Sequence, residues 1–326
     1  MSSPVPVEPA EAAAPPAPAL AYHRLARARP RYRWWRMLLT GLVGIVLYVV
    51  MLLMILVPLA LAAVFVPEIA QGAADLSTAE AFFDLDRLWL FLALVVPLIL
   101  MIPALLLASR MIEGRGVGFL SSVAGRLRWG WICRTLLLAL AVFAVYFAAA
   151  FAAAVLSGEE VAPRFDHPGI PLMILLVLLL IPFQAAAEEY VFRGYLMQLI
   201  GGWLRHPAFA ILLPVPLFVL GHAYDLWGSI SVGAFAIVAA WLTWRTGGLE
   251  AAISLHIVNN VLIFLLGSVS LVDANATEST PLDVAATIVT LVVYALIADR
   301  GAQRQGLARR AEPMPAPALA PSAGTL

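Results

Sequence analysis

Eight stretches of this sequence are apolar and free of Asp, Glu, Lys and Arg over roughly the length that crosses a lipid bilayer. A membrane-spanning helix needs about 20 largely apolar residues, and only helices and closed barrels satisfy their backbone hydrogen bonds in lipid. The sequence therefore predicts an all-α fold, a polytopic membrane helical bundle with about eight transmembrane helices. The expected spans cover residues 37–67, 88–109, 135–158, 167–187, 207–224, 226–244, 251–272 and 284–298.

The composition agrees with a membrane protein, because 63% of the residues are hydrophobic, 12% are charged and the mean hydropathy is +0.93. Soluble domains carry about twice that share of charged residues. Cys133 is the only cysteine, which excludes an intrachain disulfide and a cysteine-based zinc cluster. Metal chemistry would therefore have to use His, Glu or Asp side chains.

The two ends of the sequence differ from its apolar centre. Residues 1–30 and 301–326 are rich in Pro and Ala and poor in bulky apolar residues, which predicts disordered tails around a membrane helical domain at residues 31–300. The first apolar run begins at Met37 and is longer than the apolar part of a signal peptide. We therefore expect this run to be a membrane span.

The arginine residues predict how the spans are oriented. All 20 cationic side chains are arginine, and with eight spans all of them except Arg87 and Arg164 fall on one side. Loops rich in arginine stay on the cytoplasmic side. We therefore expect a multi-pass protein of the cell (plasma) membrane with both termini in the cytoplasm. The formal net charge of zero gives no reason to expect nucleic acid as a partner.

A few polar side chains interrupt the apolar second half of the chain. Each costs about 2–3 kcal/mol in a bilayer, so such residues usually face a cavity or one another. They are Glu188, Glu189 and Arg193 at the end of the fourth expected span, His222 late in the fifth, and His256 and Asn260 in the seventh. Three separate helices thus supply groups of the kind that activate water or stabilise an oxyanion.

Helical spacing separates these residues by role. Glu189 and Arg193 are four residues apart with the acid nearer the N-terminus, which places them on one face in the favourable order for an ion pair. We therefore expect this pair to give structural support, and we expect Glu188, which points elsewhere, to be free for chemistry. His256 and Asn260 are also four residues apart and can aim at one point.

Two other classes of protein would use the same residues. An ion-coupled transporter would arrange buried carboxylates and histidines as a proton relay, and a non-enzymatic membrane scaffold would use them only for structure. Transporters usually show two repeated halves. Here the polar residues all lie in the second half of the chain, which favours a single catalytic centre.

Together the motifs resemble those of the CPBP intramembrane proteases, also called the ABI family, which includes CAAX prenyl endopeptidases and bacteriocin-immunity proteins. The family pattern is E-E-x-x-x-R, then F-x-x-x-H, then H-x-x-x-N. The sequence carries these motifs in that order as "EEYVFR", "FVLGH" and "HIVNN", each on its own expected helix. The resemblance covers residues 169–269, where we expect the protease motif core.

The resemblance implies an intramembrane metalloendopeptidase of the CAAX prenyl protease type. It implies Glu188 as the general base for the attacking water, with His222 helping to hold that water. It also implies that His256 and Asn260 stabilise the oxyanion. The expected partner is a membrane-associated or lipoprotein-like peptide within the bilayer. A prenylated peptide and an immunity or peptide-maturation role both stay open, as does the oligomeric state.

A divalent metal ion, zinc, is an open alternative for the chemistry. His222, His256 and Glu188 would make a two-histidine, one-carboxylate zinc site. The sequence has no H-E-x-x-H motif. A glutamate and a histidine could equally activate water without a metal.

One geometric problem follows from counting residues along the helices. At about 1.5 Å per residue, Glu188 is expected near the cytoplasmic end of its span, whereas His222 lies about 24 Å along the fifth span. A straight fifth helix would keep these residues apart. We therefore expect Pro214 and Pro216 to break or tilt it, so that the four candidate catalytic residues share one water-accessible cavity.

Overall fold

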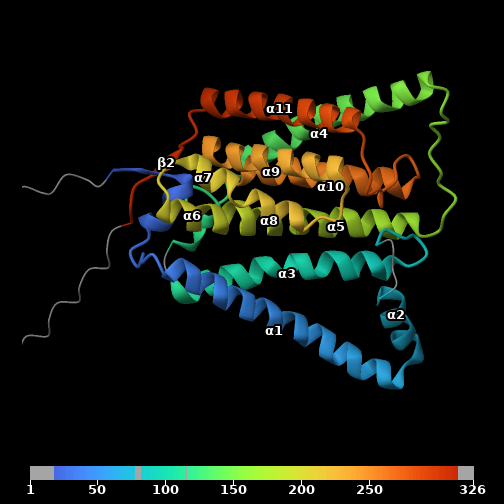
Figure 1. Ribbon diagram of the computed structural model, residues 1–326, viewed down its shortest axis with the longest axis horizontal. Helices are drawn as coiled ribbons and strands as arrows, with labels where there is room; N and C mark the ends of the chain where they lie inside the picture. The colour runs from blue at the N-terminus through green and yellow to red at the C-terminus, as the bar shows by residue number, and fades with distance from the viewer. Residues whose placement is uncertain (1–17, 78–81, 115, 315–326) are drawn as a thin grey trace, which may run out of the picture.

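The computed structural model describes residues 18–77, 82–114 and 116–314, which form a bundle of long helices (Figure 1). Within these residues, seven helices are long and apolar enough to cross a membrane, accompanied by one shorter apolar helical segment. The predicted all-α polytopic membrane fold is confirmed. The long helices are α1 (Arg36–Phe65), α3 (Leu88–Ile112), α4 (Trp129–Leu156), the continuous helix of α5 (Ile170–Glu189), η3 (Tyr190–Leu196) and α6 (Met197–Trp203), then α9 (Leu226–Thr246), α10 (Glu250–Ser268) and α11 (Pro281–Arg304).

The helices lie in layers with α10 at the centre of the bundle. α1 packs on α3, α3 packs on α5, and α5 packs on α10 (Figure 1). α4 and α9 contact α10 as well, and α11 packs on both of them. The short helix α2 (Pro67–Ser77) follows α1. α10 can therefore hold polar residues away from lipid.

Small side chains let the helices around α10 approach closely. α9 and α11 contribute to one buried cluster through Ala236, Ala239, Ala295 and Ala298. Residues of this size allow close backbone packing between membrane helices. Large apolar side chains such as Leu137 on α4 and Leu178 on α5 instead remain exposed, as expected of faces that contact lipid.

The fourth span is longer than predicted. The sequence analysis ended it at residue 187 because charged residues follow, whereas the helix runs from Ile170 to Trp203 over 34 residues. The charges do not end the helix because Glu189 and Arg193 pair inside the protein. Glu188 consequently lies about 22 Å from the helix end at Trp203. It is well inside the helix, and not near the end that was expected on the cytoplasmic side.

The fifth span is broken, as the prolines predicted. α7 (Pro207–Leu212) and α8 (Val215–Leu220) are separated at Leu213 and Pro214. Proline lacks the N–H that the ladder of helical hydrogen bonds needs. The predicted helical span was also too long at its end, because residues 221–225 are not helical.

The two ends of the described chain lie side by side. β1 (Leu20–Ala21) pairs antiparallel with β2 (Arg310–Ala311) (Figure 1). A membrane chain whose ends lie on one side crosses an even number of times. Seven helices of the described residues are long enough to cross a membrane, so the even number expected from the arginines needs the broken α7–α8 segment as an eighth crossing, which stays a prediction.

The folded part extends further toward both ends than predicted. The short helix η1 (Tyr22–Ala28) packs on α6, with Tyr22 fully buried. α11 continues to Arg304, and the backbone N–H of Met314 bonds to the carbonyl oxygen of Ala28. The expected tail boundaries at residues 30 and 301 were therefore wrong. Residues 1–17 and 315–326 of those tails lie outside the described residues.

A buried polar clasp holds the N-terminal segment against the bundle. Arg29, which is only 3% exposed, forms an ion pair with Glu113 after α3. Glycine is needed at position 201 on α6, where η1 packs against this helix, because a Cβ on Gly201 would collide with the carbonyl oxygen of His23. The N-terminal segment is folded despite its tail-like composition because its apolar side chains pack on α6 and Arg29 pairs with Glu113.

Candidate functional site

Glu189 lies at the centre of a buried charge network. Arg193 donates from Nη1 to Glu189 Oε1 at 2.7 Å, so the ion pair expected from the spacing is present. Nδ1 of His256, on α10, lies 2.8 Å from the same oxygen. Because a carboxylate accepts hydrogen bonds, this Nδ1 carries the proton and Nε2 is the ring nitrogen left for other contacts. Glu189 itself is fully buried.

Glu188 lies beside this network with a free carboxylate oxygen. Its Oε2 is 4.0 Å from Nε2 of His256, which is too far for a direct hydrogen bond and wide enough for one bridging water. Its Oε1 accepts a hydrogen bond from Nε2 of Gln184 at 2.5 Å. Glu188 is 8% exposed, so the two neighbouring glutamates are both buried but face different partners.

Asn260 joins the network through Gln184. Nδ2 of Asn260 donates to Gln184 Oε1 at 3.1 Å, and Oδ1 of Asn260 accepts from Asn259 at 2.9 Å. The sequence analysis missed Gln184. It lies four residues before Glu188 in an otherwise apolar span, and this helical spacing to a buried acid is the pattern that could have identified it.

His222 reaches the network through aromatic rings. Its Nδ1 donates to the carbonyl oxygen of Phe218 at 2.8 Å, and the centroids of the two rings lie 4.8 Å apart. The Phe218 ring lies 6.4 Å from the ring of His256, and the guanidinium of Arg193 lies 4.4 Å from its centroid. The structure therefore brings Glu188, His256 and Asn260 into one network and places His222 at its edge.

The non-helical segment after α8 faces the same region. The rings of His222 and Tyr224 are stacked with centroids 6.1 Å apart. Partial burial raises the pKa of the Tyr224 hydroxyl, and the Glu188 carboxylate raises it further. Tyr224 thus lies within electrostatic range of Glu188, so the broken fifth span turns its end toward the buried acid.

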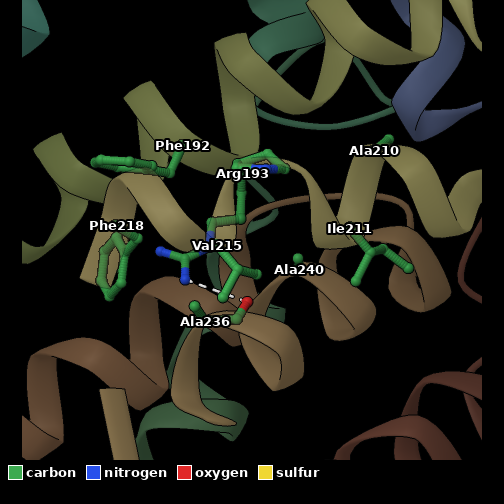
Figure 2. A pocket seen from close by; sticks show the side chains of 9 residues that line it. Phe192, Arg193, Ala210, Ile211, Val215, Phe218, Ala236 and Ala240 are labelled. Carbon is green, nitrogen blue, oxygen red and sulfur yellow. Dashed lines mark hydrogen bonds between the residues drawn. The ribbon is translucent and has the colours of Figure 1, made fainter. Parts of the chain in front are cut away.

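A π-helical segment follows directly after the two glutamates. This segment, η3, contains Arg193, and π-helical turns are rare and often lie at functional sites. Tyr190 at its start shares a hydrogen bond of 2.7 Å with Ser121, and Arg193 also donates to the carbonyl oxygen of Ala236 at 3.3 Å (Figure 2). The π-helical segment therefore contains Arg193, the cation of the Glu189–Arg193 ion pair.

A small, partly open pocket borders Arg193 (Figure 2). Apart from Arg193 its lining is apolar: Phe192, Ala210, Ile211, Pro214, Val215, Phe218, Ala236 and Ala240. None of the four candidate catalytic residues belongs to this lining of described residues. The shared water-accessible cavity therefore stays a prediction.

The zinc donor set considered from the sequence does not fit the observed geometry. Among the described residues, no group of three His, Cys, Asp or Glu side chains is placed to hold a metal ion. The hydrogen bonds of Nδ1 of His222 and Nδ1 of His256 leave both Nε2 atoms open, and they do not decide the question. We therefore derive no step of the reaction through a metal.

The fold and this network define a class: a multi-pass membrane protein whose second half holds acids, a histidine and amides inside the helical bundle. Residues 169–262 match the sequence model of the family described as "Type II CAAX prenyl endopeptidase Rce1-like". This stretch contains all six predicted site residues. The chain thus carries a domain of the Rce1-like family at residues 169–262, and the resemblance seen in the motifs is confirmed.

A relative from Bacillus subtilis (strain 168) matches part of the chain. Uncharacterized protein YyaK is 31% identical over 98 residues, which cover 28% of this chain and 33% of that protein. The match thus spans about a third of the relative's length. No solved structure matches this chain.

Proposed function

We propose that this protein is an intramembrane endopeptidase that cleaves a membrane-associated peptide with a water molecule activated by Glu188. The observation that carries the proposal is the 4.0 Å separation between Glu188 Oε2 and His256 Nε2. Both side chains are buried, at 8% and 4% exposure. A carboxylate and an imidazole at this distance can hold one water between them. The Rce1-like domain supports the protease class.

In the proposed reaction, Glu188 accepts a proton from the water while the water oxygen attacks the scissile carbonyl carbon. The same carboxyl group then returns the proton to the leaving amine. His222, at the edge of the network, helps to hold the water. Because the site is buried, the electrostatic interactions of the Glu188 carboxylate with the water and with His256 are stronger than they would be in bulk water.

We propose that the groups on α10 stabilise the oxyanion: Asn260 through the Nδ2 hydrogen that Gln184 does not accept, and His256 in the form that carries a proton on Nε2 as well as on Nδ1. His256 and Asn260 are four residues apart on one face of this helix, and both connect to the α5 residues of the site. Preorganised groups of this kind lower the barrier because they need no reorientation during the reaction. The Glu189–Arg193 pair serves by fixing the ring of His256 through Nδ1.

We further propose a substrate that is anchored in the membrane, of the prenylated CAAX type. The family description names a CAAX prenyl endopeptidase. The site residues also lie on helices whose outer faces are apolar, so a substrate that partitions into lipid reaches them most readily.

A pair of quenched fluorescent peptides that differ only in a farnesyl group tests this function in proteoliposomes. We expect cleavage of the farnesylated peptide, and a kcat/KM at least about tenfold lower for the unmodified one, because lipidation concentrates the peptide in the bilayer. No cleavage of either peptide, together with proton-coupled solute uptake, would instead support a transporter.

We expect both termini to lie in the cytoplasm. The β1–β2 pairing puts the two ends on one side, and most arginines of the sequence are expected on that same side. Fusions of green fluorescent protein to either end should fluoresce, and fusions of alkaline phosphatase should be inactive. Active phosphatase at either end would reverse the orientation and the side from which substrate enters.

A further inference from the structure

Gln184 is the polar residue of the site that neither the motifs nor the proposed reaction uses. It lies on α5 four residues before Glu188, and it is 5% exposed. Burying a primary amide in a membrane helix is costly unless its donor and acceptor atoms find partners. In this chain they do, and both partners are candidate catalytic residues.

The hydrogen bonds of Gln184 form a chain with one consistent direction. A carboxylate can only accept, so the Gln184 amide must present Nε2 to Glu188 Oε1, at 2.5 Å. Its Oε1 then faces α10 and accepts from Nδ2 of Asn260 at 3.1 Å. Oδ1 of Asn260 in turn accepts from Asn259 at 2.9 Å. The orientation of each amide is thus set by the carboxylate at the end of the chain.

We infer that Gln184 is a positioning residue that holds Glu188 in the rotamer whose Oε2 faces His256, and that ties this acid to Asn260 on the neighbouring helix. The inference rests on the proposed function. Gln184 therefore acts on the position of the base, without touching the substrate.

Gln184→Met is the variant that tests this inference, because methionine matches the size of glutamine and lacks its donor and acceptor. We expect kcat to fall by about 10²-fold, as misplacement of a catalytic group does, with KM changed less than about threefold. A Gln184→Met protein that keeps kcat within about threefold of the wild type would overturn the inference.

Gln198→Met provides the matched control. Gln198 lies on the same continuous helix, is fully buried and also makes two side-chain hydrogen bonds, to Arg29 and to the Phe119 carbonyl oxygen. It is 14 residues from Gln184 in the sequence. Gln198→Met should lower the melting temperature and leave kcat within about threefold of the wild type, because Gln198 has no contact with the site.

Gln184→Glu covers the case in which Gln184→Met does not accumulate. The carboxyl group that this substitution introduces donates to Glu188 while it is protonated, as the amide does, and it loses this donor when it ionises. The pH dependence of activity should therefore differ from that of the wild type, because two neighbouring carboxyl groups share one proton. A pH profile identical to that of the wild type would overturn the inference.

Carbodiimide labelling tests the inference without any substrate. A hydrophobic carbodiimide reacts with carboxyl groups, and mass spectrometry quantifies the labelled Glu188 peptide over time at one fixed pH. Labelling should be faster in Gln184→Met than in the wild type or Gln198→Met, because Glu188 has lost the hydrogen bond that holds its side chain in place. Identical labelling curves would overturn the role of Gln184. If the wild type cleaves no peptide but Gln184→Met still differs from it in labelling, only the proposed protease function is contradicted.

Discussion

The Glu188→Gln protein should cleave peptide about 10²–10⁴-fold more slowly than the wild type, which is the loss expected for a missing general base. Glutamine has nearly the same volume, and its Oε1 can still accept the hydrogen bond that Gln184 donates at this position. The buried ion pair of Arg193 is formed with Glu189 and stays intact. We therefore expect normal accumulation and a melting temperature close to that of the wild type.

Single-turnover cleavage in proteoliposomes measures this effect, with melting followed in detergent on the same preparation. Glu159→Gln is a suitable control, because Glu159 is an exposed acid in the loop after α4 and outside the matched domain. A Glu188→Gln protein that keeps cleavage within about threefold of the wild type would remove Glu188 from the role of base.

Glu189→Gln should damage folding more than Glu188→Gln does. Glu189 is fully buried and accepts from both Arg193 and His256. Its loss leaves the Arg193 cation unpaired in the interior, which costs about 3–5 kcal/mol for a buried pair. Accumulation in the membrane and the melting temperature should both fall, and Arg193→Met should have a similar effect.

The double variant Glu189→Gln/Arg193→Met separates the ion pair from other effects. It leaves no unpaired charge, so its loss of stability should be smaller than the sum of the two single losses. If Glu189→Gln instead accumulates normally and loses only activity, the roles of the two glutamates are the reverse of those proposed.

Local periodicity was sufficient to predict much of this molecule. The apolar runs gave the spans, and the four-residue spacing gave the Glu189–Arg193 contact, because both depend only on helix geometry. The break at Pro214 was also predictable, since proline removes a backbone donor wherever it stands.

Features that depend on tertiary partners were missed. The fourth span was ended at its first charges, because nothing in the local sequence shows that Glu189 and Arg193 are enclosed by α9 and α10. The role of Gln184 likewise depends on Asn260, which lies 76 residues away. The N-terminal segment was taken for a tail because the partner of its Arg29, Glu113, lies far along the chain, after α3.

Cleavage of the farnesylated peptide in water enriched in ¹⁸O tests the central claim most directly. The purified wild type should release two fragments, and mass spectrometry should find ¹⁸O in the new carboxyl group of the N-terminal fragment. Glu188→Gln, prepared in parallel, should release both fragments about 10²–10⁴-fold more slowly. The account would be contradicted if the wild type released no fragments, or if both proteins released them at the same rate.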